Sequence, residues 1–527
     1  MKNWKLILGL TTVGIGLRVL YYALFSNLVI ARSDAVENIM LGRSFAAGDI
    51  YGSLSPYWPP LYPWLVGIVS TFIDSLTLPA VIVSIITGSL AVPLTYWLAE
   101  QSYSKDTSLI AAIIAIFYPD LINSVFAIGT ENPYLVCVTA ALIAGWKGLK
   151  QDAGWYCFLT GVFLALAYLT RPEAIGYLLF FIPLMSISRI WQGKLAARRA
   201  IAHTVIFVLG FTLLAGPYLL YLRTETGKWT ISAKVERNFA SGAFSSEALE
   251  RSQAAADGDA GTNEQSPKAL AMNFALNLRT AQDALTKLVP FFALILVGLG
   301  LFGTSWDRER LLREGYLLLF CILTIVGYAA SFVLERYLYV LLPIFFLWIA
   351  KGITNLREWY GESSRKWKLS TRLRLSGMRL LPAVVLVALF LYLFPTNFFV
   401  RSEASKWEAI AFSERDAGEW LRRNGGDGSS LFSFSSVPVF YSQKKEFWTE
   451  TKDPERILEE IFENRVAYVV DSARSYKKRP YLANLTAALN GDPRFELIYK
   501  RNDFPGNSIA IYMTKLPNEK ADLSAPK

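Results

Sequence analysis

Two acidic residues, Asp34 and Glu37, follow soon after the first long apolar stretch of the chain, residues 6–25. A carboxylate beside a membrane surface can take a proton from a hydroxyl group, which is general-base chemistry. A structural explanation competes with this one. The letters "SDAVE" at residues 33–37 are also typical of a helix start with Ser33 or Asp34 as the N-cap.

Further ionisable and aromatic residues stand at the ends of other apolar stretches, and all are predicted to face the same side of the membrane as Asp34. Holding an ionisable group at membrane depth is costly, so such groups often mark a cavity or a pathway. Structural alternatives exist here too, since Arg171 could contact lipid headgroups and Arg336 could pair with Glu335. The residues concerned are Asp120, Glu131, Arg171, Glu173, Glu335, Arg336 and Tyr337.

These residue types suit the transfer of a sugar from a lipid phosphate. The reaction needs a carboxylate to deprotonate an acceptor hydroxyl and cations to stabilise the departing phosphate. It also needs a groove at the membrane surface, because the lipid tail of the donor stays in the bilayer. A loop over residues 27–78, lying on the membrane beside these charges, would supply that groove.

The composition is that of a polytopic membrane protein. Of 527 residues, 53% are hydrophobic and only 18% are charged, whereas charged residues make up about a quarter of an ordinary soluble protein. The net charge of +10 does not indicate nucleic-acid binding, because the basic residues lie in short links between apolar stretches, where they orient the chain in the membrane. His203 is the only histidine, which excludes a histidine-rich zinc site.

Eleven stretches are predicted to cross the membrane as helices, because each is apolar and near the length that spans the hydrocarbon core. Lys2 and Lys5 precede the first stretch, so the N-terminus is assigned to the cytoplasm and the stretch to an uncleaved anchor instead of a signal peptide. The predicted spans are residues 6–25, 79–99, 107–126, 133–147, 154–170, 174–190, 201–221, 287–304, 314–333, 337–350 and 380–396.

Residues 59–76 are apolar but short, and charge decides whether they cross. If they do not cross, the short cytoplasmic links carry eighteen basic residues and the opposite links carry only Arg171 and Arg336. A further span would reverse this distribution and violate the positive-inside rule. The segment is therefore predicted to lie in the membrane interface.

Three larger pieces share the predicted outer side: residues 27–78, residues 222–286 and the chain after residue 400. Residues 222–286 contain a small, polar stretch and are predicted to form a flexible loop. Residues 400–527 alternate helical and strand patterns, which predicts a small extracytoplasmic α/β domain beyond a membrane domain of residues 1–399. Support, acceptor recognition and partner docking are all open roles for that domain.

An ordered set of motifs over residues 1–350 resembles the GT-C membrane glycosyltransferases, particularly the protein O-mannosyltransferase and aminoarabinose transferase branch. The order of the set carries the resemblance, since no single motif is specific. The motifs are "SDAVENIMLGRSFAAGDIY", "YWPPLYPWLVG", "GTENPYLVCVTAAL", "LTRPEAIGYLLFFIP" and "ERYLYVLLPIFFLWIAKG".

The resemblance implies a GT-C type membrane fold and an inverting transferase that uses a polyprenyl-phosphate-linked sugar. By position, Asp34 would be the general base and Glu131 a second acidic residue of the site. The frequent Asp-Glu pair of the family is replaced by Asp34 and Glu37, one helical turn apart. The substrate-binding residues expected on this basis are Glu37, Tyr57, Asp120, Arg171, Glu173, Arg336 and Tyr337.

No cofactor is expected to be required, although a divalent cation such as Mg²⁺ or Mn²⁺ could be held by carboxylates. The expected partners are the polyprenyl-phosphate sugar, a protein, lipid or polysaccharide acceptor, and membrane lipids, but no nucleic acid. The inner (plasma) membrane of a bacterium is the expected location, with an extracytoplasmic active site. A flippase or transporter for lipid-linked sugars is the main alternative, and a receptor with an outer sensing domain is a third class. A transporter predicts ionisable groups near the bilayer midplane and repeated halves with interrupted helices, and no internal repeat is evident in the sequence.

Overall fold

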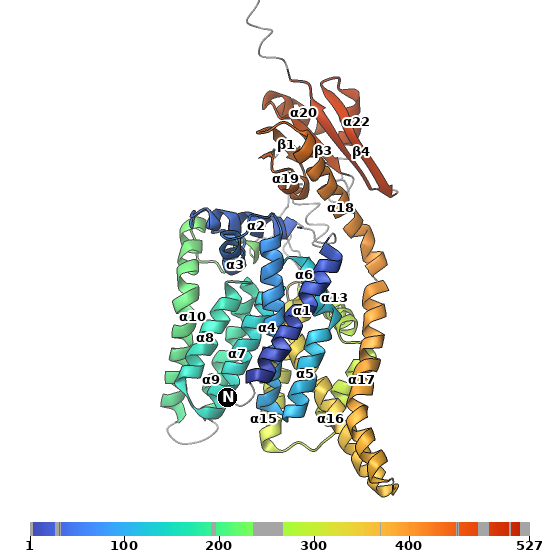
Figure 1. Cartoon of the computed structure of the whole chain (residues 1–527). Helices are drawn as coiled ribbons and strands as arrows, with labels where there is room; N and C mark the ends of the chain where they lie inside the picture. Colours follow the sequence, from blue (N-terminus) through green and yellow to red (C-terminus); the bar gives the residue numbers. More distant parts are fainter. Residues whose placement is uncertain are drawn as a thin grey trace, which may run out of the picture. The chain divides into compact units, whose positions relative to one another are not determined.

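The computed structural model of the chain is mainly helical and carries one small sheet near the C-terminus (Figure 1). It divides into two compact units. Among the described residues, the first unit contains those within 4–26, 38–235 and 267–399, and the second contains those within 31–37 and 401–516. The structure describes residues 4–26, 31, 33–190, 196–235, 267–368, 370–399, 401–449, 451, 453–472, 484–504 and 507–516.

The first unit is a bundle of helices that packs mainly apolar side chains into a common core. α8 packs against α7 and α10, α4 packs against α1, α5 and α7, and α16 packs against α14 and α17. The helices are α1 (Trp4–Phe25), α3 (Leu61–Ser70), α4 (Leu78–Ser102), α5 (Lys105–Phe117), α6 (Pro119–Ala127), α7 (Glu131–Gln151), α8 (Gly154–Tyr168), η2 (Pro172–Tyr177), α9 (Leu178–Ile190), α10 (Ala196–Thr226), α13 (Pro267–Leu288), α14 (Phe291–Phe302), α15 (Arg308–Ala329), η3 (Glu335–Leu341), α16 (Leu342–Lys366) and α17 (Thr371–Phe399).

Fewer helices than the predicted eleven are long and apolar enough to cross a membrane. Among the described residues seven helices meet that test by length and composition, and an eighth span is possible if α13 and α14 are counted as one bent pair. α8 has 15 residues and α9 has 13, so at 1.5 Å per residue each reaches only about 20 Å. α7 is long enough, but its ends carry Glu131, Lys147 and Lys150.

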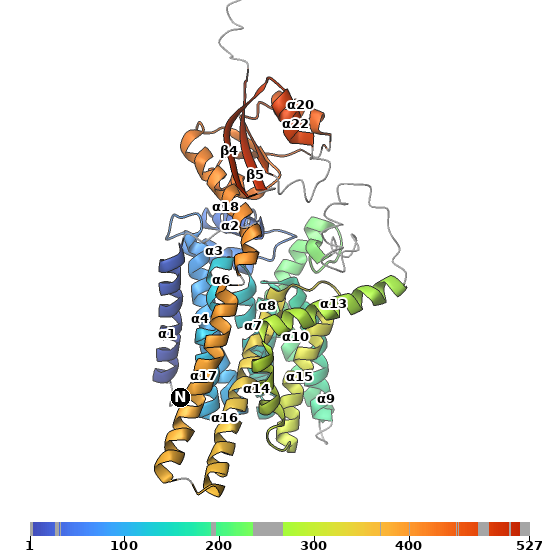
Figure 2. The ribbon, with the colours of Figure 1, turned by 90° about the vertical axis from the view of Figure 1, so that its right-hand side faces the viewer.

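Two interruptions were not visible as hydrophobic periodicity. The predicted span 107–126 is divided by Pro119 into α5 and α6, since proline cannot donate the next helical hydrogen bond. α13 and α14 meet at an angle of 92°, so α13 runs across the neighbouring helices (Figure 2). Part of the loop predicted as flexible is thus the helix α13, whereas residues 236–266 lie outside the described residues.

The segment predicted to lie in the interface forms the short helix α3, residues 61–70. Ten residues span about 15 Å, which is half of the hydrocarbon core, so α3 alone cannot cross. Its Gly67 approaches α2 (Ser33–Ala46) so closely that a β-carbon there would lie 2.8 Å from the Phe45 side chain. The backbone amide of Leu61 donates to the Leu169 carbonyl, which fixes the start of α3 to the end of α8.

The second unit contains the predicted C-terminal sheet, with strand order β2-β1-β3-β5-β4. β1 pairs in parallel with β2 and β3, whereas β5 pairs antiparallel with β3 and β4. The elements are α18 (Arg401–Asn424), β1 (Ser430–Ser433), α19 (Ser436–Ser442), β2 (Lys445–Phe447), α20 (Pro454–Glu463), β3 (Tyr468–Ser472), α22 (Leu485–Gly491), β4 (Phe495–Phe504) and β5 (Asn507–Thr514). Unexpectedly, residues 30–37 of the first outer loop belong to this unit as well.

Candidate functional site

Glu131 and two arginines from distant parts of the chain meet in the first unit. Glu131 is the first residue of α7, Arg171 immediately precedes η2, and Arg336 lies in the first turn of η3. The Glu131 Oε1 atom lies 3.4 Å from Arg171 Nη1 and 3.4 Å from Arg336 Nε. Three predicted site residues are therefore brought together by the starts of three helical elements.

Glu173 completes this cluster from the other side of Arg171. Its Oε1 atom lies 3.3 Å from Arg171 Nη2. Burial raises the pKa of the Glu173 carboxyl, but the charge and hydrogen bond of Arg171, a backbone hydrogen bond and the charge of Lys234 together hold the pKa below its ordinary value. The Glu173 Oε2 atom has no hydrogen-bond partner among the described residues. It is a buried acceptor on a residue that lines the neighbouring cavity.

Aromatic rings hold the Arg171 guanidinium in place. Its central carbon lies 4.1 Å from the ring centroid of Tyr337 and 5.5 Å from that of Tyr134. Arg171 is only 6% exposed, whereas the Arg336 side chain is 44% exposed. Arg171 is thus a buried, fixed cation, and Arg336 is the cation that a ligand could reach.

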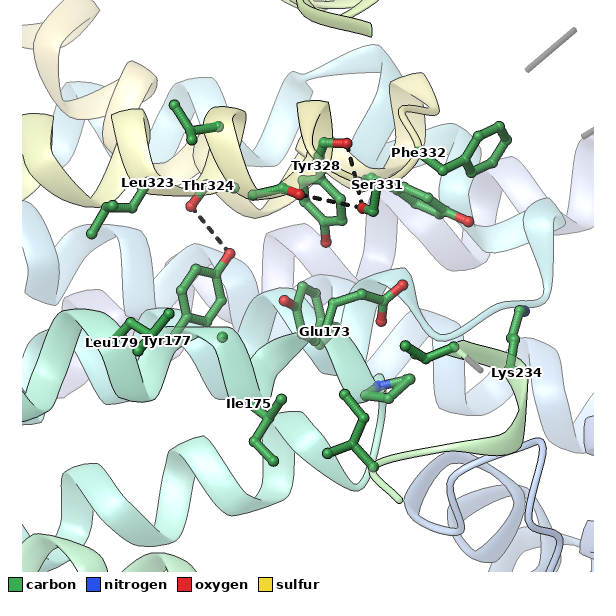
Figure 3. Close-up of a pocket in the computed structure, with 18 residues that line it drawn as sticks. Glu173, Ile175, Tyr177, Leu179, Lys234, Leu323, Thr324, Tyr328, Ser331 and Phe332 are labelled. Atoms are coloured by element: carbon green, nitrogen blue, oxygen red, sulfur yellow. Dashed lines mark hydrogen bonds between the residues drawn. The ribbon is translucent and has the colours of Figure 1, made fainter. Parts of the chain in front are cut away.

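A cavity of about 390 Å³ adjoins this cluster. Figure 3 shows η2 side chains along one side of the cavity, α15 side chains along the other, and Lys234 at one end. Glu173 and Lys234 are its charged lining residues, and most of the remaining lining is aromatic or aliphatic. Leu179 and Val326 line the cavity and are 77% and 40% exposed. The cavity therefore opens beside apolar side chains that would contact lipid.

Lys234 is a lining residue that the sequence did not indicate. Its amine lies 3.9 Å from the ring centroid of Trp58 and 5.6 Å from that of Tyr57. The neighbouring Ala233 amide donates to the Pro56 carbonyl at 3.0 Å. This contact fastens the start of one outer loop to the other, and so connects the predicted residue Tyr57 to the cavity. No local motif marks Lys234, because its position depends on contacts between two loops.

Asp34 and Glu37 lie in the first turns of α2, within the second unit. Glu37 is exposed, but neighbouring groups remove part of the water around its carboxyl. This desolvation and the negative charge of Asp34 raise the pKa of the carboxyl. Asp120 lies in the first turn of α6 and is 9% exposed. The roles of these three residues at the site stay predictions.

No group of three or more His, Cys, Asp or Glu side chains within the described ranges is arranged to hold a metal ion. Glu131 and Glu173 have arginine partners instead. The optional Mg²⁺ or Mn²⁺ stays a prediction.

Residues 58–219 match the family of dolichyl-phosphate-mannose-protein mannosyltransferases. This stretch contains Glu131, Arg171 and Glu173 but neither Asp34 nor Arg336. No curated protein matches the sequence as a whole or in part. The family match therefore covers about a third of the chain and supports glycosyl transfer as its chemistry.

Solved structures with similar folds cover nearly the whole chain. ArnT from Cupriavidus metallidurans bound to undecaprenyl phosphate is 11% identical, with a TM-score of 0.57 and 100% of each chain covered. The Archaeoglobus fulgidus oligosaccharyltransferase in the apo form is 14% identical, with a TM-score of 0.52, and the match covers 97% of this chain and 76% of that one. The archaeal enzyme AglB in complex with an inhibitory peptide and a dolichol-phosphate is 13% identical, with a TM-score of 0.51, and the match covers 97% and 76%.

These comparisons confirm the predicted GT-C fold and the resemblance to GT-C glycosyltransferases. The membrane-spanning helices and the small C-terminal sheet agree with the predicted fold class. The family match supports a glycosyltransferase, and the structural likeness together with the long apolar helices supports the fold of an integral membrane protein.

Proposed function

We propose that this protein, which has the GT-C fold, moves a sugar from a polyprenyl-phosphate donor to a hydroxyl-bearing acceptor with inversion at the anomeric carbon. The observation that carries the proposal is the cluster of Glu131, Arg171, Glu173 and Arg336 beside a largely apolar cavity. A ligand that fits this site is an amphiphile with a polar, anionic end. A polyprenyl-phosphate sugar has that composition.

The cavity suits a donor whose tail remains in the bilayer. Its aromatic and aliphatic lining contributes favourable apolar contact, and the exposed Leu179 and Val326 lie where the lipid tail would leave the protein. Glu173 Oε2 and the hydroxyls of Tyr134 and Tyr177 offer hydrogen bonds for the sugar ring.

Arg336 and Lys234 are the proposed phosphate-binding cations. Arg336 is partly exposed and Lys234 lines the cavity, so both can approach an anion that enters from the membrane. Arg171 keeps Glu131 and Glu173 in place, since it contacts both carboxylates. The positive charges of Arg336 and Lys234 would stabilise the phosphate as it leaves.

In the proposed reaction Asp34 takes the proton of the acceptor hydroxyl. The hydroxyl oxygen forms a bond to the anomeric carbon on the face opposite the phosphate. At the same time the bond between the anomeric carbon and the phosphate oxygen breaks, and its electron pair stays on that oxygen. The products are the glycosylated acceptor and the polyprenyl phosphate, and the proton is released from Asp34 to water. We place this site on the extracytoplasmic face of a bacterial inner membrane.

The test is an assay of the purified protein with a set of radiolabelled polyprenyl-phosphate sugars and with protein, lipid and polysaccharide acceptors. The wild type is expected to transfer one of the sugars, and Asp34→Asn to lose about 10²- to 10⁴-fold in rate while remaining folded. Asp74→Asn changes a fully exposed carboxylate of the same outer loop and should keep the wild-type rate. Equal rates for wild type and Asp34→Asn would exclude Asp34 as the base.

Transport of the intact donor across vesicles, without sugar transfer, would instead favour a flippase.

Lys234→Gln is expected to raise KM for the donor by about tenfold or more, because a charge-assisted hydrogen bond is lost.

A further inference from the structure

The compact unit at the C-terminus contains a short piece of the first outer loop, residues 30–37. Ala31, in that piece, is completely buried. Its backbone amide donates a hydrogen bond of 3.0 Å to the hydroxyl of Tyr441 in α19, which is also buried. A hydrogen bond between two residues that are 410 positions apart in the sequence thus fixes the chain two residues before α2 begins.

Tyr441 is itself held firmly within the unit. Gly418 of α18 lies so close to α19 that a β-carbon there would be 2.7 Å from the Pro438 carbonyl oxygen and 2.8 Å from the Tyr441 β-carbon. Ser435 caps the N-terminus of α19 and donates to Glu414 Oε2 at 3.0 Å. The close packing of α18 on α19 therefore leaves the Tyr441 ring little freedom to move.

Glu414 ties this arrangement to the sheet. Its carboxylate is fully buried and also accepts a hydrogen bond of 3.1 Å from Ser472 at the end of β3. The anchor at Ala31 is consequently connected through α19 and α18 to the core of the C-terminal unit.

The helix dipole favours an acidic residue such as Asp34 in the first turn of α2, but like charges crowd around that end of the helix. Asp34 and Glu37 repel each other, and Glu446 of β2 adds a third negative charge near Glu37. Helix ends fray readily when few contacts hold them. A fixed point just before the helix limits that fraying where Asp34 is located.

We infer that Tyr441 is a positioning residue through which the C-terminal unit orders the Asp34 segment for general-base chemistry. This inference rests on the proposed function, because it takes Asp34 as the base. It assigns the C-terminal unit a part in catalysis that requires no contact between Tyr441 and substrate. The hydrogen bond contributes on the order of 1 kcal/mol, which corresponds to roughly a two- to tenfold change in the equilibrium between the open and closed forms of the segment.

The first experiment compares amide hydrogen exchange of the full-length wild type and Tyr441→Phe, which keeps the ring and removes the hydroxyl. Exchange of the peptide covering residues 30–37 is expected to accelerate by about two- to tenfold. Tyr512→Phe is the matched control, since it removes a 3.0 Å hydrogen bond to Asn490 in the same unit. Unchanged exchange in Tyr441→Phe, or an equal effect of Tyr512→Phe, would overturn the inference.

The second experiment measures kcat and KM for the donor in Tyr441→Phe, Asp34→Asn and the double variant. A positioning role predicts a lower kcat with nearly constant KM in Tyr441→Phe, and no further loss when Asp34 is already replaced. The same loss in both backgrounds would show that Tyr441 acts only on stability. If Asp34→Asn keeps the wild-type rate, the general-base proposal and the positioning role fall together, while hydrogen exchange still decides whether Tyr441 anchors the segment.

Discussion

Glu131 is the residue on which the electrostatics of the cluster depend. Its Oε1 atom faces Arg171 and Arg336 together, and its side chain is only 10% exposed. Both cations have lost part of their hydration, so the shared carboxylate balances charge that water would otherwise solvate. In an exposed ion pair water solvates both charges, so neither depends on its partner in this way.

We therefore expect Glu131→Gln to destabilise the protein by about 3 kcal/mol, at the low end for a broken buried pair because Arg171 still contacts Glu173. The rate of sugar transfer from the donor should also fall, because Arg171 and Arg336 would no longer be held in fixed positions. Glu309→Gln removes the exposed partner of Lys150 and is the control, with no measurable change in unfolding expected. Thermal unfolding in detergent compares the two variants, and equal behaviour would contradict a buried, shared carboxylate.

Glu446 gives a pH-dependent prediction in the second unit. Burial and the charge of Glu37 raise the pKa of its carboxyl. A carboxyl with a raised pKa in the folded state favours folding in acid, and this contribution is lost as pH rises through that pKa. Glu446→Gln should thus stabilise the unit near pH 7 but not near pH 4. Unfolding at both pH values tests this, with Glu496→Gln, which removes the partner of Lys515, as the control; the same gain at both would be evidence against charge repulsion.

Residue types at helix ends were enough to find much of the cluster. Glu131, Arg171, Glu173 and Arg336 were predicted because charges at the ends of apolar stretches are costly, and the structure brings all four together. Lys234 was not predictable in this way, since only the contact between two loops places it at the cavity. The contact between Ala31 and Tyr441 was equally invisible, because no periodicity relates residues so far apart.

At the scale of elements, pairs of glycines allow the closest helix contacts. In α8, a β-carbon on Gly161 would collide with the Phe207 carbonyl of α10. In α10, a β-carbon on Gly210 would collide with the Phe158 carbonyl of α8. Small residues that let two backbones approach are a common basis of helix packing in membranes, where lipid tails compete with apolar side chains.

Gly161→Ala and Gly210→Ala should each destabilise the bundle by about 1–3 kcal/mol, because the added methyl group forces α8 and α10 apart. Gly216→Ala lies in the same helix α10, where a β-carbon meets nothing within 4 Å, and should cause no loss. Thermal unfolding of the three purified variants provides the comparison. Helix propensity alone would favour alanine at all three positions, so an equal loss in Gly216→Ala would contradict close approach of α8 and α10 as the cause.

The positions of the helices were predicted better than their continuity. Apolar runs gave α1, α4 and α10 to within a few residues, because length and hydrophobicity act locally. The division of α5 from α6 and the 92° bend at α14 depend on a proline and on packing partners. The short strand β2 also escaped prediction, since three residues carry too little pattern to identify an edge strand.

At the scale of the whole molecule, the proposed reaction requires the residues around the cavity and the C-terminal unit to share the extracytoplasmic side. The basic links predict this orientation, because eighteen basic residues would otherwise be translocated. The three native cysteines are buried, so a cysteine introduced at an exposed position would be labelled selectively by a membrane-impermeant maleimide. Orientation can therefore be read from single positions in the full-length protein.

Asp427→Cys and Lys105→Cys form the matched pair, since both replace exposed residues, one between α18 and β1 and one at the start of α5. We expect labelling of Asp427→Cys in intact cells and labelling of Lys105→Cys only after the membrane is permeabilised, because the positive-inside rule places Lys105 in the cytoplasm. The reverse pattern would place the C-terminal unit inside the cell, where Tyr441 would hold the Asp34 segment on the wrong side for an extracytoplasmic donor. Labelling of both positions in intact cells would mean that the number of crossings between residues 105 and 427 differs from the prediction by an odd number, and the helix bounds could then be used to locate the difference.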